Sequence, residues 1–133
     1  MNEDLIFEGH IEIRALPDGR GRFPATEWLD ELALKERRRA DAGMANYDRA
    51  EQEGLRGTGR VETVHGRRHK LLELKLTRGT TPGPQLRFLG IRRGRTFWVA
   101  HAFVKKTRRI RARDIEAAER MLDRWLEAGG EHP

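Results

Sequence analysis

The stretch QLRFLGIRRGRTFWVAHAFV, residues 85–104, decides the fold of this chain of 133 residues. Its two halves, 85–91 and 96–104, are rich in aromatic and branched apolar side chains, which favour β-strands. The Arg-Arg-Gly-Arg segment between them makes a loop so short that the two strands must pair antiparallel. We therefore predict that this stretch forms the hairpin at the centre of an antiparallel sheet.

Another strand is expected just upstream, where the run LLELKL at 71–76 alternates leucine with Glu73 and Lys75. Successive residues of a strand point to opposite faces, so these leucines are expected in the core and the two charged residues on the other face. Arg87 lies between apolar neighbours and falls in the same phase as Lys75 if those neighbours enter the core. Lys75 and Arg87 are therefore predicted to share an open sheet face with the lysines that follow the last strand.

The flanking segments predict one more strand and the helices. Residues 5–16 alternate apolar with polar residues, which is typical of an extended segment. An amphipathic helix is expected to begin at Thr26 as its N-cap, and a weaker helical stretch follows at 35–53. Gly43 is a candidate break, so a helical hairpin and one bent helix remain alternatives. The 3.6-residue spacing of apolar residues at 114–126 predicts a final helix.

This order of elements predicts a single α+β domain over residues 1–133. The expected arrangement is an antiparallel sheet packed by an N-terminal helix or helical hairpin and by the C-terminal helix, with the helices on one sheet face. Residues 1–22 are expected to be an N-terminal extension that contains a strand, and residues 129–133 a tail. The glycine-rich segment 54–66 is expected to be a loop.

Positive charge is concentrated in one part of the chain. Residues 56–113 hold 17 Lys and Arg against 2 Asp and Glu, whereas residues 1–55 hold 8 against 13 and residues 114–133 hold 2 against 6. So large a basic block between acidic ends indicates a polyanionic partner, most simply a nucleic acid. The alternative is a basic surface that mainly keeps the protein in solution.

Other features of the composition exclude whole classes of protein. The chain has no cysteine, so disulfides, thiolate catalysis and cysteine-bound zinc are excluded. No apolar run approaches the roughly 18 residues of a membrane-spanning helix, and the start does not read as a signal peptide. We expect a cytoplasmic protein with no membrane contact, no metal site and no cofactor.

Several short motifs resemble a known toxin family. The segments HKLLELKL (69–76), LRFLGI (86–91), AHAFVKKT (100–107) and DIEAAER (114–120) resemble the phage-derived HigB-like branch of the RelE toxin superfamily. The resemblance covers about residues 23–126, and FVKKT followed by DIEAA is its most specific part. It implies a RelE-like fold and a toxin of a type II toxin–antitoxin pair. It also implies cleavage of mRNA in the ribosomal A site, and a helix-turn-helix, HigA-like antitoxin as the partner that silences the toxin.

The chain departs from the family pattern in the sheet. Lys75 stands where the family has arginine, which keeps the charge but loses bidentate phosphate geometry. Leu86 stands where the family has tyrosine. The only tyrosine, Tyr47, lies in a predicted helix, so a tyrosine base on the sheet is not expected.

The reaction that the resemblance implies is attack of an RNA 2′-hydroxyl on the adjacent phosphodiester, without a metal. Arg87 is the predicted phosphate clamp, because a guanidinium fits two phosphate oxygens. Lys105 and Lys106 are predicted to stabilise the developing charge or to protonate the leaving oxygen. The predicted base is Lys75, if neighbouring cations disfavour its protonation. Rival bases are Glu73 and His101, the latter having a core histidine as its alternative.

Further basic residues are predicted to contact the RNA backbone without sequence preference. They are Arg68, His69, Lys70, Arg92, Arg93, Arg95, Arg108, Arg109, Arg111 and Arg113. Their alternative is ordinary solvation of exposed loops. Two other functions stay open, namely a ParE-like poison of DNA gyrase and a nucleic-acid-binding prophage protein without catalytic activity.

Overall fold

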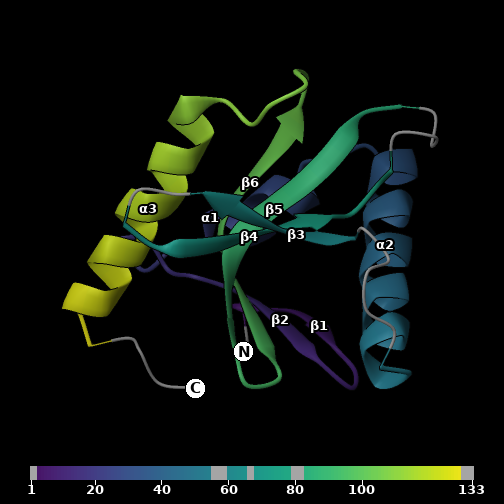
Figure 1. The fold of residues 1–133 in the computed structure, drawn as a ribbon, viewed down its shortest axis with the longest axis horizontal. Coiled ribbons are helices and arrows are strands. Elements are labelled where there is room, and N and C mark those ends of the chain that lie inside the picture. Colours follow the sequence, from purple (N-terminus) through teal and green to yellow (C-terminus); the bar gives the residue numbers. More distant parts are fainter. Residues whose placement is uncertain (1–2, 55–59, 66–67, 79–82, 130–133) are drawn as a thin grey trace.

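A computed structural model describes residues 3–54, 60–65, 68–78 and 83–129 of the chain. Its elements are β1 (Leu5–Glu8), β2 (Glu12–Ala15), α1 (Pro24–Asp30), α2 (Leu34–Gln52), β3 (Val61–His65), β4 (Lys70–Lys75), β5 (Gln85–Arg93), β6 (Thr96–Lys105) and α3 (Ala112–Glu127). The strands of this part of the chain form a six-stranded sheet in the order β1-β2-β6-β5-β4-β3 (Figure 1). The predicted α+β class is confirmed.

The sheet is mixed rather than purely antiparallel, and it has two more strands than the sequence predicts. Strands β3 to β6 pair antiparallel, but β2 pairs parallel to β6. The predicted extended segment 5–16 is a hairpin of β1 and β2. The connection between these strands is fixed to α2 by a hydrogen bond from the Ile11 amide to Asp48 Oδ1. Residues 61–65, expected to be loop, form β3 because they pair along β4.

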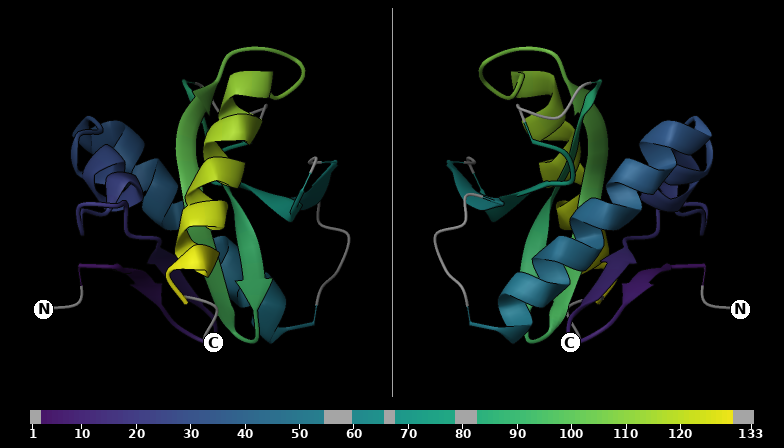
Figure 2. Two further views of the ribbon diagram at one scale, coloured as in Figure 1. Left: turned by 90° about the vertical axis from the view of Figure 1, so that its left-hand side faces the viewer. Right: turned by 90° about the vertical axis from the view of Figure 1, so that its right-hand side faces the viewer.

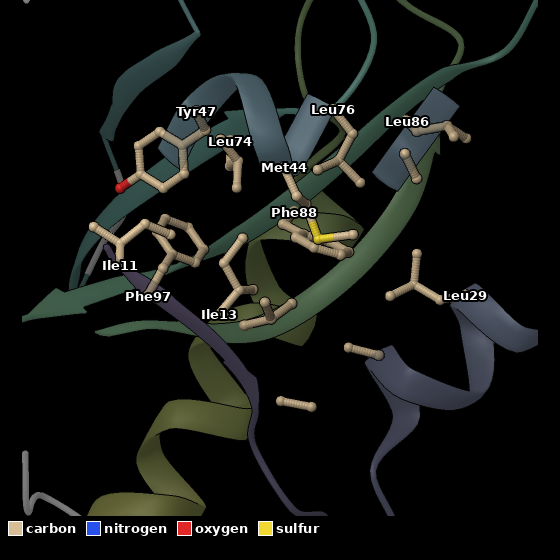
Figure 3. Packing of buried hydrophobic residues seen from close by; sticks show 14 residues of the cluster. Ile11, Ile13, Leu29, Met44, Tyr47, Leu74, Leu76, Leu86, Phe88 and Phe97 are labelled. Carbon is tan, nitrogen blue, oxygen red and sulfur yellow. The ribbon is translucent and has the colours of Figure 1, made fainter. Parts of the chain in front are cut away.

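Helices cover both faces of the sheet, so the prediction that they share one face is wrong. Figure 1 shows α2 and α3 on opposite sides of the central strands. On the side of α1 and α2, Leu29 and Met44 pack with Phe88 of β5 and with other buried side chains (Figure 3). On the other side, Leu122 and Trp125 of α3 pack in a second cluster. Because α3 is amphipathic, its apolar side must pack on an apolar surface. Part of the sheet face that is predicted to be open provides this surface.

Strand β6 contains a bulge that shifts which of its residues face each cluster. Leu89 pairs with His101 and Gly90 pairs with Val99, which leaves Ala100 as an extra residue. An extra residue reverses the alternation of side chains along a strand. Val99 before the bulge and Ala102 after it therefore both pack on the side of α2, although three positions separate them, whereas Ala100 packs in the cluster beneath α3.

Helix α2 runs without a break through Gly43, contrary to the predicted interruption. Gly43 is buried, and a Cβ atom at this position would collide with the main chain of Leu76, just beyond β4. The glycine therefore allows the helix to approach the sheet closely. Helix α1 begins at Pro24, two residues before the predicted cap, because the fixed φ of proline suits the first helical position. Thr26 lies inside the helix, and its Oγ1 donates to the carbonyl of Glu3 instead of capping.

The substitution Gly43→Ala is expected to lower the free energy of unfolding by about 3 kcal/mol, since the new methyl group overlaps backbone that cannot easily move. This loss is expected although alanine has the better helix propensity by about 1 kcal/mol. Urea denaturation measures the change. The matched control is Ala42→Gly at the exposed neighbouring position, which tests propensity alone. A Gly43→Ala variant as stable as wild type would show that α2 does not need this close approach.

Candidate functional site

A pocket of about 300 Å³ lies along the last part of β6. Of β6, strand β2 pairs only with Thr96–Val99. This ladder ends where the Leu16 amide donates to the Val99 carbonyl, because Pro17 has no N–H to continue it. Within the described strands, the end of β6 therefore has a free edge. Figure 2 shows the loop that leads from this end of β6 to the start of α3. The pocket is lined by Trp28, His101, Ala102, Phe103, Val104, Lys105, Lys106, Thr107, Arg111, Arg113 and Asp114.

This pocket brings together five residues that the sequence predicts as functional. His101, Lys105 and Lys106 are predicted catalytic residues, and Arg111 and Arg113 are predicted RNA contacts. Four of the five carry a positive charge at neutral pH, irrespective of His101. The pocket can therefore hold an anionic group such as a phosphate.

His101 is neither a core residue nor a free surface residue. Its side chain is 26% exposed, and its ring stacks on Phe103 with centroids 5.5 Å apart. Its Nε2 atom lies 2.8 Å from Oδ1 of Asp114, in the first turn of α3. The sequence reading did not single out Asp114. The available signal was an acidic residue at the start of the predicted last helix, close behind the strand that carries His101.

Arg87 is buried, so the prediction that it lies on an open, solvated face is wrong. The residue is 5% exposed and Glu73 beside it is 3% exposed. Arg87 Nε donates to Glu73 Oε2 at 3.0 Å, and Lys105 Nζ lies 3.7 Å from the same oxygen. Burial lowers the pKa of Arg87, and the charge of Glu73 opposes that effect. Glu73, Arg87 and Lys105 thus share one sheet face, as predicted, but Glu73 and Arg87 form a buried ion pair and Lys105 lies half-buried beside it.

The guanidinium of Arg87 is fully engaged within the protein. Besides Glu73, it donates to the carbonyls of Thr77 and Leu86 and, at 3.4 Å, to the side-chain oxygen of Gln85. All three of its nitrogens therefore donate hydrogen bonds, and a phosphate would have to displace some of them. The predicted clamp role stays a prediction.

Lys75 lies on the same face but contacts a different carboxylate. Its Nζ donates to Glu62 Oε1 at 2.6 Å, and Lys75 lowers the pKa of Glu62 through this hydrogen bond. Glu62 belongs to β3, the strand that the sequence reading missed. The contact is thus with an anion, whereas the predicted base role depends on neighbouring cations.

Several predicted RNA contacts form ion pairs with helices or with β2. Arg68 pairs with Asp123 of α3 at 2.9 Å, and His69 Nε2 lies 2.6 Å from the same carboxylate. His69 and Arg68 lower the pKa of Asp123. Arg92 donates to Tyr47 and Glu51 of α2, and Arg95 pairs with Glu12 of β2. These interactions connect the β3–β4 hairpin to α3 and the β5–β6 hairpin to α2 and β2. The positive charges involved are partly neutralised and attract an anionic ligand less strongly.

The basic residues that follow β6 differ from these in lacking such ion pairs with the described residues. Lys106, Arg108, Arg109, Arg111 and Arg113, which we call the basic segment, are all exposed. Within the part of the chain that the structure describes, none of their side chains forms an ion pair. The same holds for Lys70 and for Arg93, which lie apart from this pocket beside another hollow. Because the basic segment is continuous with the pocket, it forms an uncompensated positive surface around the pocket mouth.

The described residues hold no cluster of three or more His, Asp or Glu side chains that could bind a metal ion. Tyr47 packs in the core cluster of α2, and burial raises its pKa. No helix in the described ranges is long and apolar enough to cross a membrane. Residues 130–133 of the predicted tail lie outside those ranges.

Comparison with curated proteins finds no match. Comparison with protein families matches residues 27–123 to the phage-derived protein Gp49-like family (DUF891). This range includes the pocket, the basic segment and strands β3 to β6, whereas the β1–β2 hairpin lies before it. The match covers most of the chain, and the family belongs to the RelE-like toxin group. The chain is therefore a member of the phage-derived Gp49-like family.

Proposed function

We propose that this protein is the toxin of a type II toxin–antitoxin pair and that it cleaves mRNA on the ribosome. The observation that carries the proposal is the pocket at the end of β6, which His101 and Lys105 line together with residues of the uncompensated basic segment. Exposed arginines that lack protein partners bind phosphate backbones without reading bases. Membership of a toxin-like family supports the same conclusion. The proposed substrate places the protein in the cytoplasm.

The proposed reaction is attack of a ribose 2′-hydroxyl on the adjacent phosphodiester, for which the chain needs no metal. Lys106 neutralises the charge that builds on the phosphate, and Arg111 and Arg113 hold the flanking backbone. Lys105 reaches the pocket from the sheet, with its ammonium near Glu73. In this scheme Glu73 and Arg87 fix the position of Lys105 from below.

The test uses purified protein and ribosomes stalled on an mRNA with a defined codon in the A site. We expect a cut within that codon, leaving a 2′,3′-cyclic phosphate and a 5′-hydroxyl, as attack by the 2′-oxygen requires. A well-folded protein that leaves this mRNA intact would contradict the proposal. Cleavage with a 5′-phosphate end would keep the substrate but contradict the chemistry.

A partner antitoxin of the helix-turn-helix type is part of the proposal. A segment of it rich in Asp and Glu would complement the basic segment and exclude RNA from the pocket. Strand cleavage by gyrase in response to the protein, with mRNA intact, would instead support the gyrase-poison alternative. Salt-sensitive RNA binding without a growth defect would support the inactive alternative.

A further inference from the structure

We propose that Asp114 is a positioning residue that sets the proton on His101, so that His101 takes the proton of the attacking 2′-hydroxyl. This inference rests on the proposed function and adds to it the identity of the general base. It begins from the 2.8 Å contact between His101 Nε2 and Asp114 Oδ1 at the pocket wall.

The contact fixes which ring nitrogen carries a hydrogen. An ionised carboxylate only accepts hydrogen bonds, so Nε2 must be the N–H that donates to Asp114. In the neutral ring, Nδ1 then bears the lone pair. No described residue hydrogen bonds to Nδ1, which leaves that atom available to a ligand. His101 thus has the tautomer and the free acceptor that a general base requires.

The ring is also held in place. Stacking on Phe103, at an interplanar angle of 15°, limits its rotation, and the bulge at Ala100 puts both rings on the α3 side of β6. Asp114 is itself fixed in the first turn of α3, where the helix dipole favours a carboxylate. The base is therefore preorganised by two elements that the sequence brings together only in the folded state.

The charged groups around the ring suit the reaction. Lys105, Lys106, Arg111 and Arg113 line the same pocket, and among the described residues of its lining Asp114 is the only carboxylate. The cations draw a phosphate toward the imidazole, while Asp114 stabilises the imidazolium that forms when the proton arrives. The apolar side chain of Trp28 completes the wall on the side of α1.

The step balances as a proton transfer coupled to phosphoryl transfer. His101 Nδ1 takes the 2′-hydroxyl proton, the bond from O2′ to phosphorus forms, and the bond from phosphorus to O5′ breaks. The ammonium of Lys106 gives a proton to O5′. The products are a 2′,3′-cyclic phosphate and a 5′-hydroxyl. Exchange with water then restores the protonation of both side chains.

The first arm of the test needs no activity. Two-bond ¹H–¹⁵N spectra of the full-length protein report the tautomer of each histidine, and the His101→Gln spectrum identifies the signals of His101. We expect the Nε2–H tautomer in the neutral ring of the wild type and a mixture in Asp114→Asn, whose amide can accept or donate. A wild-type ring that carries its hydrogen on Nδ1 would overturn the proposal.

The second arm measures single-turnover cleavage on stalled ribosomes. Glutamine can keep the hydrogen bond to Asp114 but cannot take a proton, so His101→Gln is expected to cleave about 100-fold more slowly. Asp114→Asn keeps a hydrogen-bonding partner and is expected to cleave about tenfold more slowly. Ribosome affinity and urea stability of both variants should stay close to wild type, which separates proton transfer from a structural tie between β6 and α3.

The outcomes distinguish the inference from the proposed function. If wild type cleaves and the His101→Gln variant cleaves equally fast, the proposed roles of His101 and Asp114 are overturned, whereas the proposed nuclease activity stands. If the variants lose activity only because they bind the ribosome more weakly, the proton-transfer role of His101 and Asp114 is also overturned, since that result indicates a structural role. If wild type does not cleave, the proposed function is overturned. The role of His101 as general base is then overturned too, even when its tautomer is as expected.

Discussion

Replacing Lys105 and Lys106 together by alanine is expected to slow cleavage of ribosome-bound mRNA by about 10³-fold. Both side chains line the pocket, where the proposed reaction builds negative charge on the phosphate. Removing a single preorganised group that stabilises developing negative charge commonly costs about 10²- to 10³-fold in rate. The rate is measured in single-turnover experiments with saturating protein.

The matched control for the lysine pair is the double variant of Lys35→Ala and Arg38→Ala. Both are exposed residues of α2, on the far side of the sheet from α3, so their removal lowers the net charge by the same two units without touching the pocket. If the two variants lose activity equally, the loss reflects general attraction to RNA rather than chemistry at the pocket. In that case the difference in cleavage rate from wild type should also become smaller as the salt concentration is raised, because salt screens exposed charges.

Removing the carboxylate of Glu73 is expected to have the largest effect on stability. Glu73→Ala leaves the guanidinium of Arg87 buried without its counter-charge, and breaking a buried pair in this way costs about 3–5 kcal/mol. Replacing both partners with leucine is expected to cost much less, because no uncompensated charge remains. Urea denaturation of the single and double variants gives the comparison.

The control for this cluster is the neighbouring pair of Lys75 and Glu62. The Glu62 side chain is 55% exposed, so Glu62→Ala is expected to cost less than about 1 kcal/mol. A Glu73→Ala variant no less stable than Glu62→Ala would show that the buried cluster contributes little to folding. Its role would then lie in placing Lys105.

The sequence predicts the central sheet and α3 well, since both depend on local alternation and periodicity. The hairpin of β5 and β6 and the helix over 112–127 lie where the apolar pattern places them. The sequence does not predict strand β3, because three of the five residues of VETVH are polar and its strand conformation comes from pairing with β4. Tertiary pairing of this kind leaves no local signal.

The candidate site was predicted in part for a related reason. Alternation correctly placed Glu73, Lys75 and Arg87 on one sheet face, but it says nothing about what covers that face. The burial of Arg87 follows from its partners on other segments, and the contact between His101 and Asp114 depends on the bulge at Ala100. A one-residue irregularity cannot be read from a periodic pattern.

The free edge at the end of β6 also bears on self-association. An unpaired strand edge presents backbone groups on which a second copy of the chain can build, and proteins commonly guard such edges with lysine. Here Lys105 ends β6 and Lys106 follows it, at the end of the stretch that pairs with β5 on one side and with no described strand on the other. The same two charges that the proposed reaction needs would therefore also keep neighbouring molecules from pairing through this edge. Replacing both lysines by apolar residues is therefore expected to make the protein more prone to aggregate as well.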